Sequence, residues 1–167
     1  MILNEIIMIF AVLLAPVIAV QVSQYLDRDR QKRDGRLKIF KKLMATRASQ
    51  LAPAHVEALN MIDVEFYGNN KKDKDVTIAW KAYIDHLTDE NYPKESWHIK
   101  KTDLLIELLY IMAKSLNYNF DKTHIKNTSY FPKGYGELED DQFILRKGFL
   151  ALMSGEKSLS VQIDKKT

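Results

Sequence analysis

The sequence predicts an all-α protein with a single N-terminal transmembrane helix, a basic stalk, and then a compact bundle of about four to five helices. Three observations support this fold class. Residues 6–26 carry no formal charge, apolar residues further along recur every three or four positions, and no two alternating β-branched runs are joined by a turn. The first pattern is typical of a membrane span and the second of amphipathic helices. The third argues against a β-sheet.

The composition restricts the class of protein. A chain of 167 residues is long enough for one ordinary domain plus an anchor. It has no cysteine, which excludes disulfides, zinc–thiolate sites and cysteine nucleophiles. Residues 27–47 hold nine Lys or Arg against three acids, whereas residues 48–167 hold sixteen against eighteen. The basic excess is therefore local, which favours membrane lipids as partners and gives no reason to expect nucleic acid.

Residues 1–26 are predicted to be the transmembrane anchor. The uncharged run of 21 residues is roughly 31 Å long as a helix, close to the ~30 Å hydrocarbon thickness of a bilayer. A cleaved signal peptide is disfavoured because the segment before the run contains Glu5 and no Lys or Arg. A soluble core helix is disfavoured because residues 6–20 show no periodic polar position. The predicted anchor residues are Ile6, Phe10, Leu14, Pro16, Val20 and Tyr25.

Residues 27–36 contain no apolar side chain, so they are predicted to form a solvated juxtamembrane stalk. The residues expected to contact lipid headgroups are Arg28, Arg30, Lys32, Arg33 and Arg36. Positive charge after the apolar run predicts a cytoplasmic C-terminal domain and an outward-facing N-terminus. The expected location is the bacterial inner membrane.

Residues 37–156 are predicted to form the helical cytoplasmic domain, and residues 157–167 a tail. Apolar stripes predict helices over residues 37–44, 53–66, 76–87, 104–116 and 138–153. Pro53 suits the first turn of the second helix. The segment 104–112 is the most apolar, so we expect it to be central in the bundle. Acidic residues at the start of the last helix suit its dipole, and Gly155 marks its end.

Catalytic chemistry finds little support in the sequence. No phosphate-binding loop, nucleophile elbow or dinucleotide fingerprint occurs, and no two histidines have the spacing of metal ligands on one helix. Asp103 and Glu107 share a helix face, but Lys100 and Lys114 on the same stripe favour ordinary surface ion pairs. We therefore predict no catalytic residue, no metal and no cofactor, and the sequence favours a non-enzymatic role.

The segment 121–136 is the strongest candidate for binding a partner or ligand. It is long for a loop in a small bundle and is rich in groups that stack or form hydrogen bonds. The alternative is that its aromatic side chains only pack the loop onto the helices. The candidate binding residues are Arg47, His124, Tyr130, Lys133 and Tyr135.

Three stretches, residues 43–48, 58–66 and 124–136, resemble a bacterial family of short proteins of unknown function. The likeness extends over nearly the full length, including the N-terminal hydrophobic segment and its basic flank. It implies an N-terminal membrane helix, a helical cytoplasmic unit and a bacterial or phage source. It supplies no activity.

Three functions remain open from the sequence. The first is a single-pass, membrane-anchored binding or scaffold module that forms a homo-oligomer or binds an unknown protein partner. The second is a membrane-disrupting effector of the phage-defence or toxin type. The third is a small-molecule or nucleotide sensor or enzyme that uses the 121–136 loop.

Overall fold

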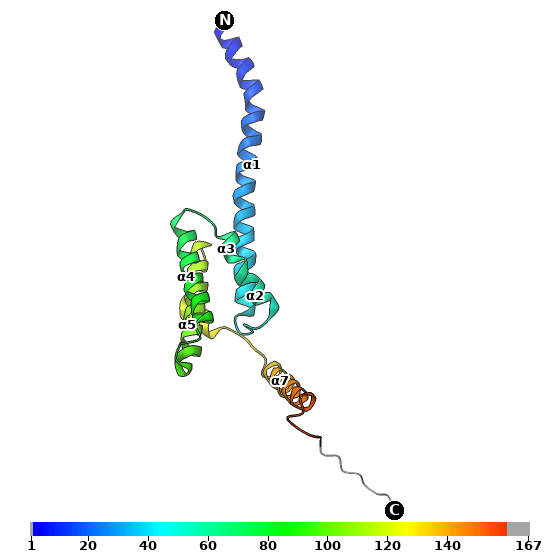
Figure 1. Cartoon of the computed structure of the whole chain (residues 1–167). Coiled ribbons are helices and arrows are strands. Elements are labelled where there is room, and N and C mark those ends of the chain that lie inside the picture. The colour runs from blue at the N-terminus through cyan, green and yellow to red at the C-terminus, as the bar shows by residue number, and fades with distance from the viewer. Residues whose placement is uncertain (1, 160–167) are drawn as a thin grey trace, which may run out of the picture. The chain divides into compact units, whose positions relative to one another are not determined.

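The computed structural model describes the backbone of residues 2–159 and their side chains except those of residues 2–7, 9–13 and 139 (Figure 1). The chain divides into two compact units, Met1–Ser129 and Tyr130–Thr167. Each unit is described by itself below.

The predicted all-α class is confirmed, because the described residues form helices and no strand. The helices are α1 (Ile2–Thr46), α2 (Pro53–Asn60), α3 (Ile62–Glu65), α4 (Lys71–Thr88), α5 (Lys94–Ser115), α6 (Lys122–Asn127) and α7 (Lys133–Met153). The predicted helix over 53–66 is divided in two at Met61, and the predicted loop 121–136 contains α6 and the first turn of α7. These two regions therefore contain more elements than predicted, whereas α4, α5 and α7 begin earlier than the predicted helices.

Helix α1 is continuous over 45 residues, so the predicted anchor, stalk and first domain helix form one element. Pro16 lies inside it. The basic residues Arg28, Arg30, Lys32 and Arg33 are exposed along its middle, where Arg30 lies 3.8 Å from the Asp27 carboxylate. Arg36 differs from them because it turns into the first unit.

The predicted inner-membrane location is contradicted. Among the residues that the structure describes, no helix is both long enough and apolar enough to cross a membrane. Ile6 and Phe10 of the predicted anchor lie outside the described side chains. The transmembrane anchor and the membrane-effector hypothesis are therefore not retained.

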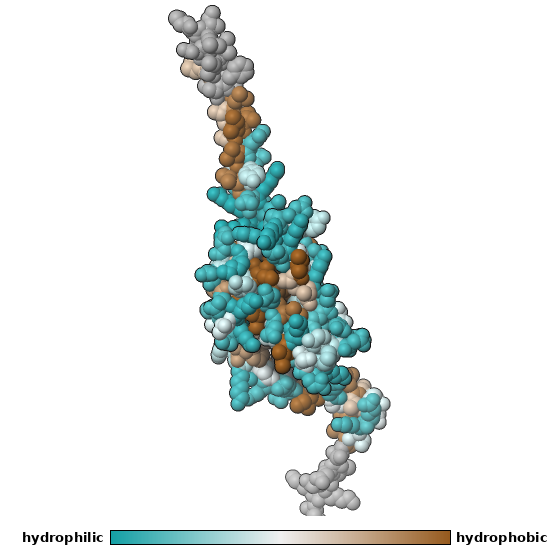
Figure 2. Space-filling model, turned by 90° about the vertical axis from the view of Figure 1, so that its left-hand side faces the viewer, coloured by the Kyte–Doolittle hydropathy of each residue, from teal (hydrophilic) through white to brown (hydrophobic). Residues whose placement is uncertain are grey.

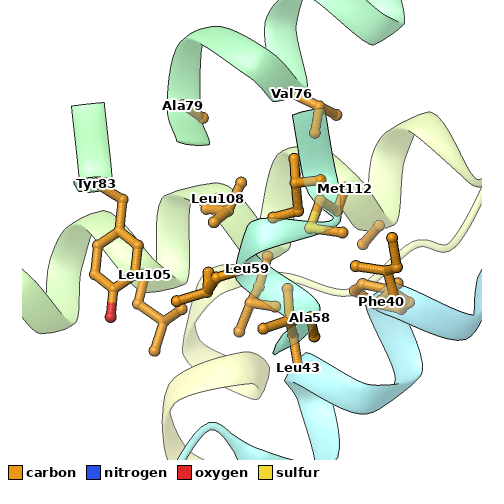
Figure 3. Close-up of a cluster of buried hydrophobic side chains, with 14 of the residues drawn as sticks. Phe40, Leu43, Ala58, Leu59, Val76, Ala79, Tyr83, Leu105, Leu108 and Met112 are labelled. Atoms are coloured by element: carbon orange, nitrogen blue, oxygen red, sulfur yellow. The ribbon is translucent and has the colours of Figure 1, made fainter. Parts of the chain in front are cut away.

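The core of the first unit forms where the C-terminal part of α1 meets α2, α4 and α5 (Figure 3). Helix α5 contributes Leu105, Leu108 and Met112 to it, and Leu108 and Met112 are fully buried. Helices α4 and α5 lie side by side along their length (Figure 1). The remaining buried core residues include Phe40, Leu43, Leu59, Ile62, Phe66, Val76, Tyr83 and Ile125. The segment predicted to be central, 104–112, is thus the helix with the most buried side chains.

Local signals explain where several helices begin and end. Asn70 caps α4 by accepting a hydrogen bond from the Asp73 backbone N–H at 2.9 Å, and Asp121 caps α6 in the same way. Helix α5 ends because Asn117 adopts φ 65°, a left-handed conformation that asparagine tolerates. The N–H of Tyr118 then bonds back to the Ala113 carbonyl at 2.8 Å.

An ion pair between Arg36 and Asp73 joins α1, α3 and α4. The Arg36 Nη2 donates to Asp73 Oδ2 at 2.7 Å, and its Nε donates to the Glu65 carbonyl at 2.9 Å. Asp73 is only 2% exposed and also accepts from Asn70 Nδ2 at 2.6 Å. A Cβ at Gly68 would collide with the Asp73 carboxylate, so a larger residue there would displace it.

The replacement Asp73→Ala is expected to destabilise the first unit by about 3–5 kcal/mol, because it leaves the Arg36 guanidinium partly buried without its partner. Urea unfolding followed by circular dichroism measures the change. Asp75→Ala, at an exposed position on the same helix, is the matched control and should change stability by less than about 0.5 kcal/mol. Equal effects of the two replacements would contradict the proposed role of the ion pair.

Candidate functional site

Arg47 lies just beyond the end of α1 and connects it to α6. Its Nε donates to the Ile125 carbonyl at 3.1 Å, its Nη2 donates to Thr128 Oγ1 at 3.1 Å, and its Nη1 donates to the Met44 carbonyl. The structure therefore brings Arg47 onto the 121–136 segment, with which the sequence grouped it. Partial burial lowers the pKa of Arg47, although the group remains a cation at neutral pH.

Beside Arg47 lies a cavity of about 270 Å³, called the Arg47 cavity here. Its polar lining comes from Arg47, Gln50, Thr102, Lys126 and Ser129, and its apolar lining from Ala48, Leu105, Ile106, Leu109 and Ile125. No carboxylate lines it, so both of its charges are positive. The buried Oε1 of Gln50 has no hydrogen-bond partner among the described residues.

The other predicted binding residues are divided between the two units. His124 is exposed on α6, and its ring stacks on Phe120 with 5.2 Å between the ring centroids. Tyr130, Lys133 and Tyr135 belong to the second unit, where all three are exposed. Lys133 lies 3.7 Å from the Glu137 carboxylate, and Tyr135 packs near Phe131 at 6.4 Å.

Two buried histidines were not singled out by the sequence. His86 Nε2 lies 3.0 Å from the Trp97 carbonyl, and His55 Nδ1 lies 2.8 Å from Thr46 Oγ1. Because Thr46 Oγ1 already donates to the Lys42 carbonyl at 2.8 Å, it accepts from His55, which places the proton on Nδ1. Burial, and to a smaller extent the charge of Lys101, lowers the pKa of His55. The sequence did not indicate the burial of His55, because a single histidine among a few apolar residues has no characteristic pattern.

Helix α7 is the only helix among the described residues of the second unit. It exposes Leu138, Phe143, Ile144, Leu145, Phe149, Leu150 and Met153, each by more than half. Its charges are unevenly distributed along its length. After Lys133 in the first turn, Glu137, Asp140 and Asp141 lie in the N-terminal half, and Arg146 and Lys147 lie in the C-terminal half. On the first unit, Figure 2 shows a run of hydrophobic side chains along part of α1, and mostly hydrophilic side chains with small hydrophobic patches over the rest of the face in view. The α1 side chains that are about half exposed include Leu14, Val17, Ile18, Val20 and Val22.

A family model matches the whole chain, residues 1–167. The chain belongs to DUF6680, a family of unknown function. The predicted resemblance to an uncharacterised family is thereby confirmed, whereas a bacterial source and a membrane helix are not. No curated protein and no solved structure matches the chain. The function of this DUF6680 member is therefore inferred from the cavities and surfaces of its structure.

A second hollow of this DUF6680 chain lies between α4 and α5 and has a volume of about 490 Å³. Three of its charged lining residues already have partners within the chain. Lys72 donates to Asn117 Oδ1 at 3.1 Å, Lys114 donates to Asn119 Oδ1 at 2.9 Å, and Glu107 pairs with Lys122. No described acid pairs with Arg47, so the Arg47 cavity is the stronger candidate for a ligand. Among the described residues, no group of three His, Asp or Glu is arranged to hold a metal.

The lowered pKa of His55 predicts how stability depends on pH. The folded state favours the neutral ring, so stability is fully present above the unfolded pKa of about 6.5 and is lost as pH falls toward the lower folded pKa. The loss from this group is at most about 1.4 kcal/mol per pH unit. Urea unfolding at pH 7.5 and pH 5.5 should show less difference for His55→Gln than for the parent. The exposed His98→Gln is the control, and a His55→Gln variant with an unchanged pH dependence would contradict this account.

Proposed function

We propose that this protein is a non-enzymatic scaffold that assembles with copies of itself through α7. The observation that supports the proposal is the exposed apolar surface of this helix, which no other described helix of its own unit covers. A large apolar patch exposed on a protein surface is typical of an interaction site. Most of the stability of a helix in a protein comes from the packing of its apolar face, so packing against a partner would stabilise this helix of 21 residues.

The spacing along α7 indicates what kind of packing the helix is suited to. Tyr135, Leu138, Gln142, Leu145, Phe149 and Leu152 follow one another at alternating intervals of three and four residues. This is the heptad spacing of a coiled-coil seam, with one polar residue in its centre. A single buried glutamine at such a position favours a defined register at some cost in stability.

The second copy is proposed to pack in the antiparallel orientation. In that orientation the half with Asp140 and Asp141 lies along the half with Arg146 and Lys147 of the other copy. The charges alone do not select it, because a parallel pair with the same seam would place Asp141 beside Arg146 of the other copy. The antiparallel orientation also aligns the helix dipoles favourably.

The ionic contacts of the described chain are consistent with a structural rather than a catalytic role. The Arg36–Asp73 pair joins helices, Lys42 lies 3.0 Å from the Glu57 carboxylate, and Lys122 contacts Glu107. These three pairs join α1 to α4, α1 to α2, and α5 to α6, respectively. A binding module needs rigid elements of this kind to present a surface.

Replacement of Leu145 by Asp is expected to shift the full chain from oligomer to monomer. The change places a charge at the centre of the seam in both copies and should weaken association by more than a hundredfold, about 3 kcal/mol per dimer. Sedimentation velocity over a concentration series measures this. The neighbouring Ile144→Asp has the same chemistry outside the seam and is the matched control. A parent chain that is monomeric at all concentrations, or equal dissociation by both variants, would contradict the proposal.

The double replacement Arg146→Glu with Lys147→Glu tests the charged contacts between the two copies. It turns attractive contacts with the acidic half of the other copy into repulsive ones and should weaken association by roughly tenfold at low salt, with the difference shrinking at high salt. Lys74→Glu with Lys81→Glu on α4 gives the same change in net charge and should leave association unchanged. No weakening by the α7 double variant would contradict charged contacts between the copies.

A further inference from the structure

We infer that the Arg47 cavity binds a small aliphatic carboxylate that also carries a hydroxyl or amide donor. This inference concerns the first unit and does not depend on the assembly of α7. It rests on the charges, the unpaired acceptor and the apolar lining of the cavity.

The first argument is charge. Arg47 is half-buried, and its three hydrogen bonds go to two carbonyls and one hydroxyl, so its positive charge is not neutralised by any described acid. A guanidinium has five N–H donors, so two of them remain to bind an anion. Lys126 adds a second cation to the lining. A cation that is partly removed from water is stabilised by a counter-charge, which an anionic ligand supplies.

The second argument is the unpaired acceptor. Gln50 Nε2 donates to the Arg47 carbonyl at 3.3 Å, which orients the amide so that its Oε1 is buried without a partner among the described residues. A buried acceptor of this kind is stabilised by a donor from a ligand. An ammonium donor is disfavoured because Arg47 and Lys126 line the same cavity and Lys101 is adjacent in sequence to Thr102. A neutral hydroxyl or amide fits better.

The third argument is the apolar lining and the size. Leu105, Ile106, Leu109 and Ile125 provide apolar walls on which a short aliphatic chain packs. The volume of about 270 Å³ is just below the ~300 Å³ at which typical ligand pockets begin, so the ligand is small. Ser129 offers a hydroxyl that can donate to a carboxylate, whereas the Thr102 hydroxyl already donates to the His98 carbonyl at 2.9 Å and is left as an acceptor.

Isothermal titration calorimetry on the full chain tests the inference with three probes. The first, 2-hydroxy-4-methylpentanoate, has the carboxylate, the hydroxyl and a branched apolar chain. The second, 4-methylpentanoate, lacks the hydroxyl, and the third, 2-hydroxy-4-methylpentanamide, lacks the charge. The hydroxy acid is expected to bind about tenfold more tightly than the amide and severalfold more tightly than the acid without the hydroxyl.

Variants locate the binding without disturbing Arg47, whose bonds support the fold. Lys126→Gln should weaken binding of the hydroxy acid about tenfold and leave the amide unaffected, whereas the exposed Lys81→Gln on α4 should change neither. Gln50→Leu should abolish the preference for the hydroxyl but keep the preference for the carboxylate. The inference is overturned if the hydroxy acid gives no saturable binding, if the amide binds equally well, or if Lys126→Gln has no effect.

Discussion

The ion pair between Arg36 and Asp73 is the interaction on which the packing of the first unit depends. It connects α1 to α4 directly at 2.7 Å and to α3 through the Glu65 carbonyl. The Arg36 guanidinium also lies over the Phe66 ring, 5.4 Å from its centroid, so the charged group and the apolar core share one boundary. Because Asp73 also hydrogen-bonds the capping residue Asn70, the start of α4 and the docking of α1 are stabilised together. The core residues of α5 then pack against elements whose positions this pair has fixed.

Arg47 has a comparable connecting role at the other end of the same stretch of α1, but with a different chemical outcome. Arg36 has a carboxylate partner, and its charge is satisfied within the protein. Arg47 bonds only neutral groups and lines a cavity that contains a second cation and an unpaired amide oxygen. Arg36 therefore stabilises the fold, whereas we propose that Arg47 binds a ligand. Helix α7 provides a third kind of surface, apolar and divided in charge, which is suited to a second copy of the chain.

Periodicity predicted the helical class, the burial of the 104–112 segment and the approximate extent of the last helix, because these depend on the spacing of apolar residues along the chain. The division at Met61 and the short α6 depend on caps and single turns, which leave only weak patterns. Arg36 was grouped with the exposed stalk, and its true partner, 37 residues away, has no local signature. The contact of Arg47 with α6 spans 78 residues and was suggested only by the isolation of its charge. The membrane location was wrong because it rested on the hydropathy of one segment, and no helix of the described chain meets the requirement for a span.

The central claim is that α7 pairs with a second copy in the antiparallel orientation, and a distance measurement between identical spin labels tests it most directly. The chain has no cysteine, so Gly134→Cys or Ile144→Cys provides a single labelling site near one end or near the middle of α7. Pulsed electron paramagnetic resonance on each full-length variant then gives the distance between the two copies. Antiparallel pairing about the centre of the seam predicts a short distance for residue 144 and a separation along the axis of roughly 28 Å for residue 134. Equal short distances at both positions would show parallel pairing, and the absence of any defined distance would contradict assembly through α7.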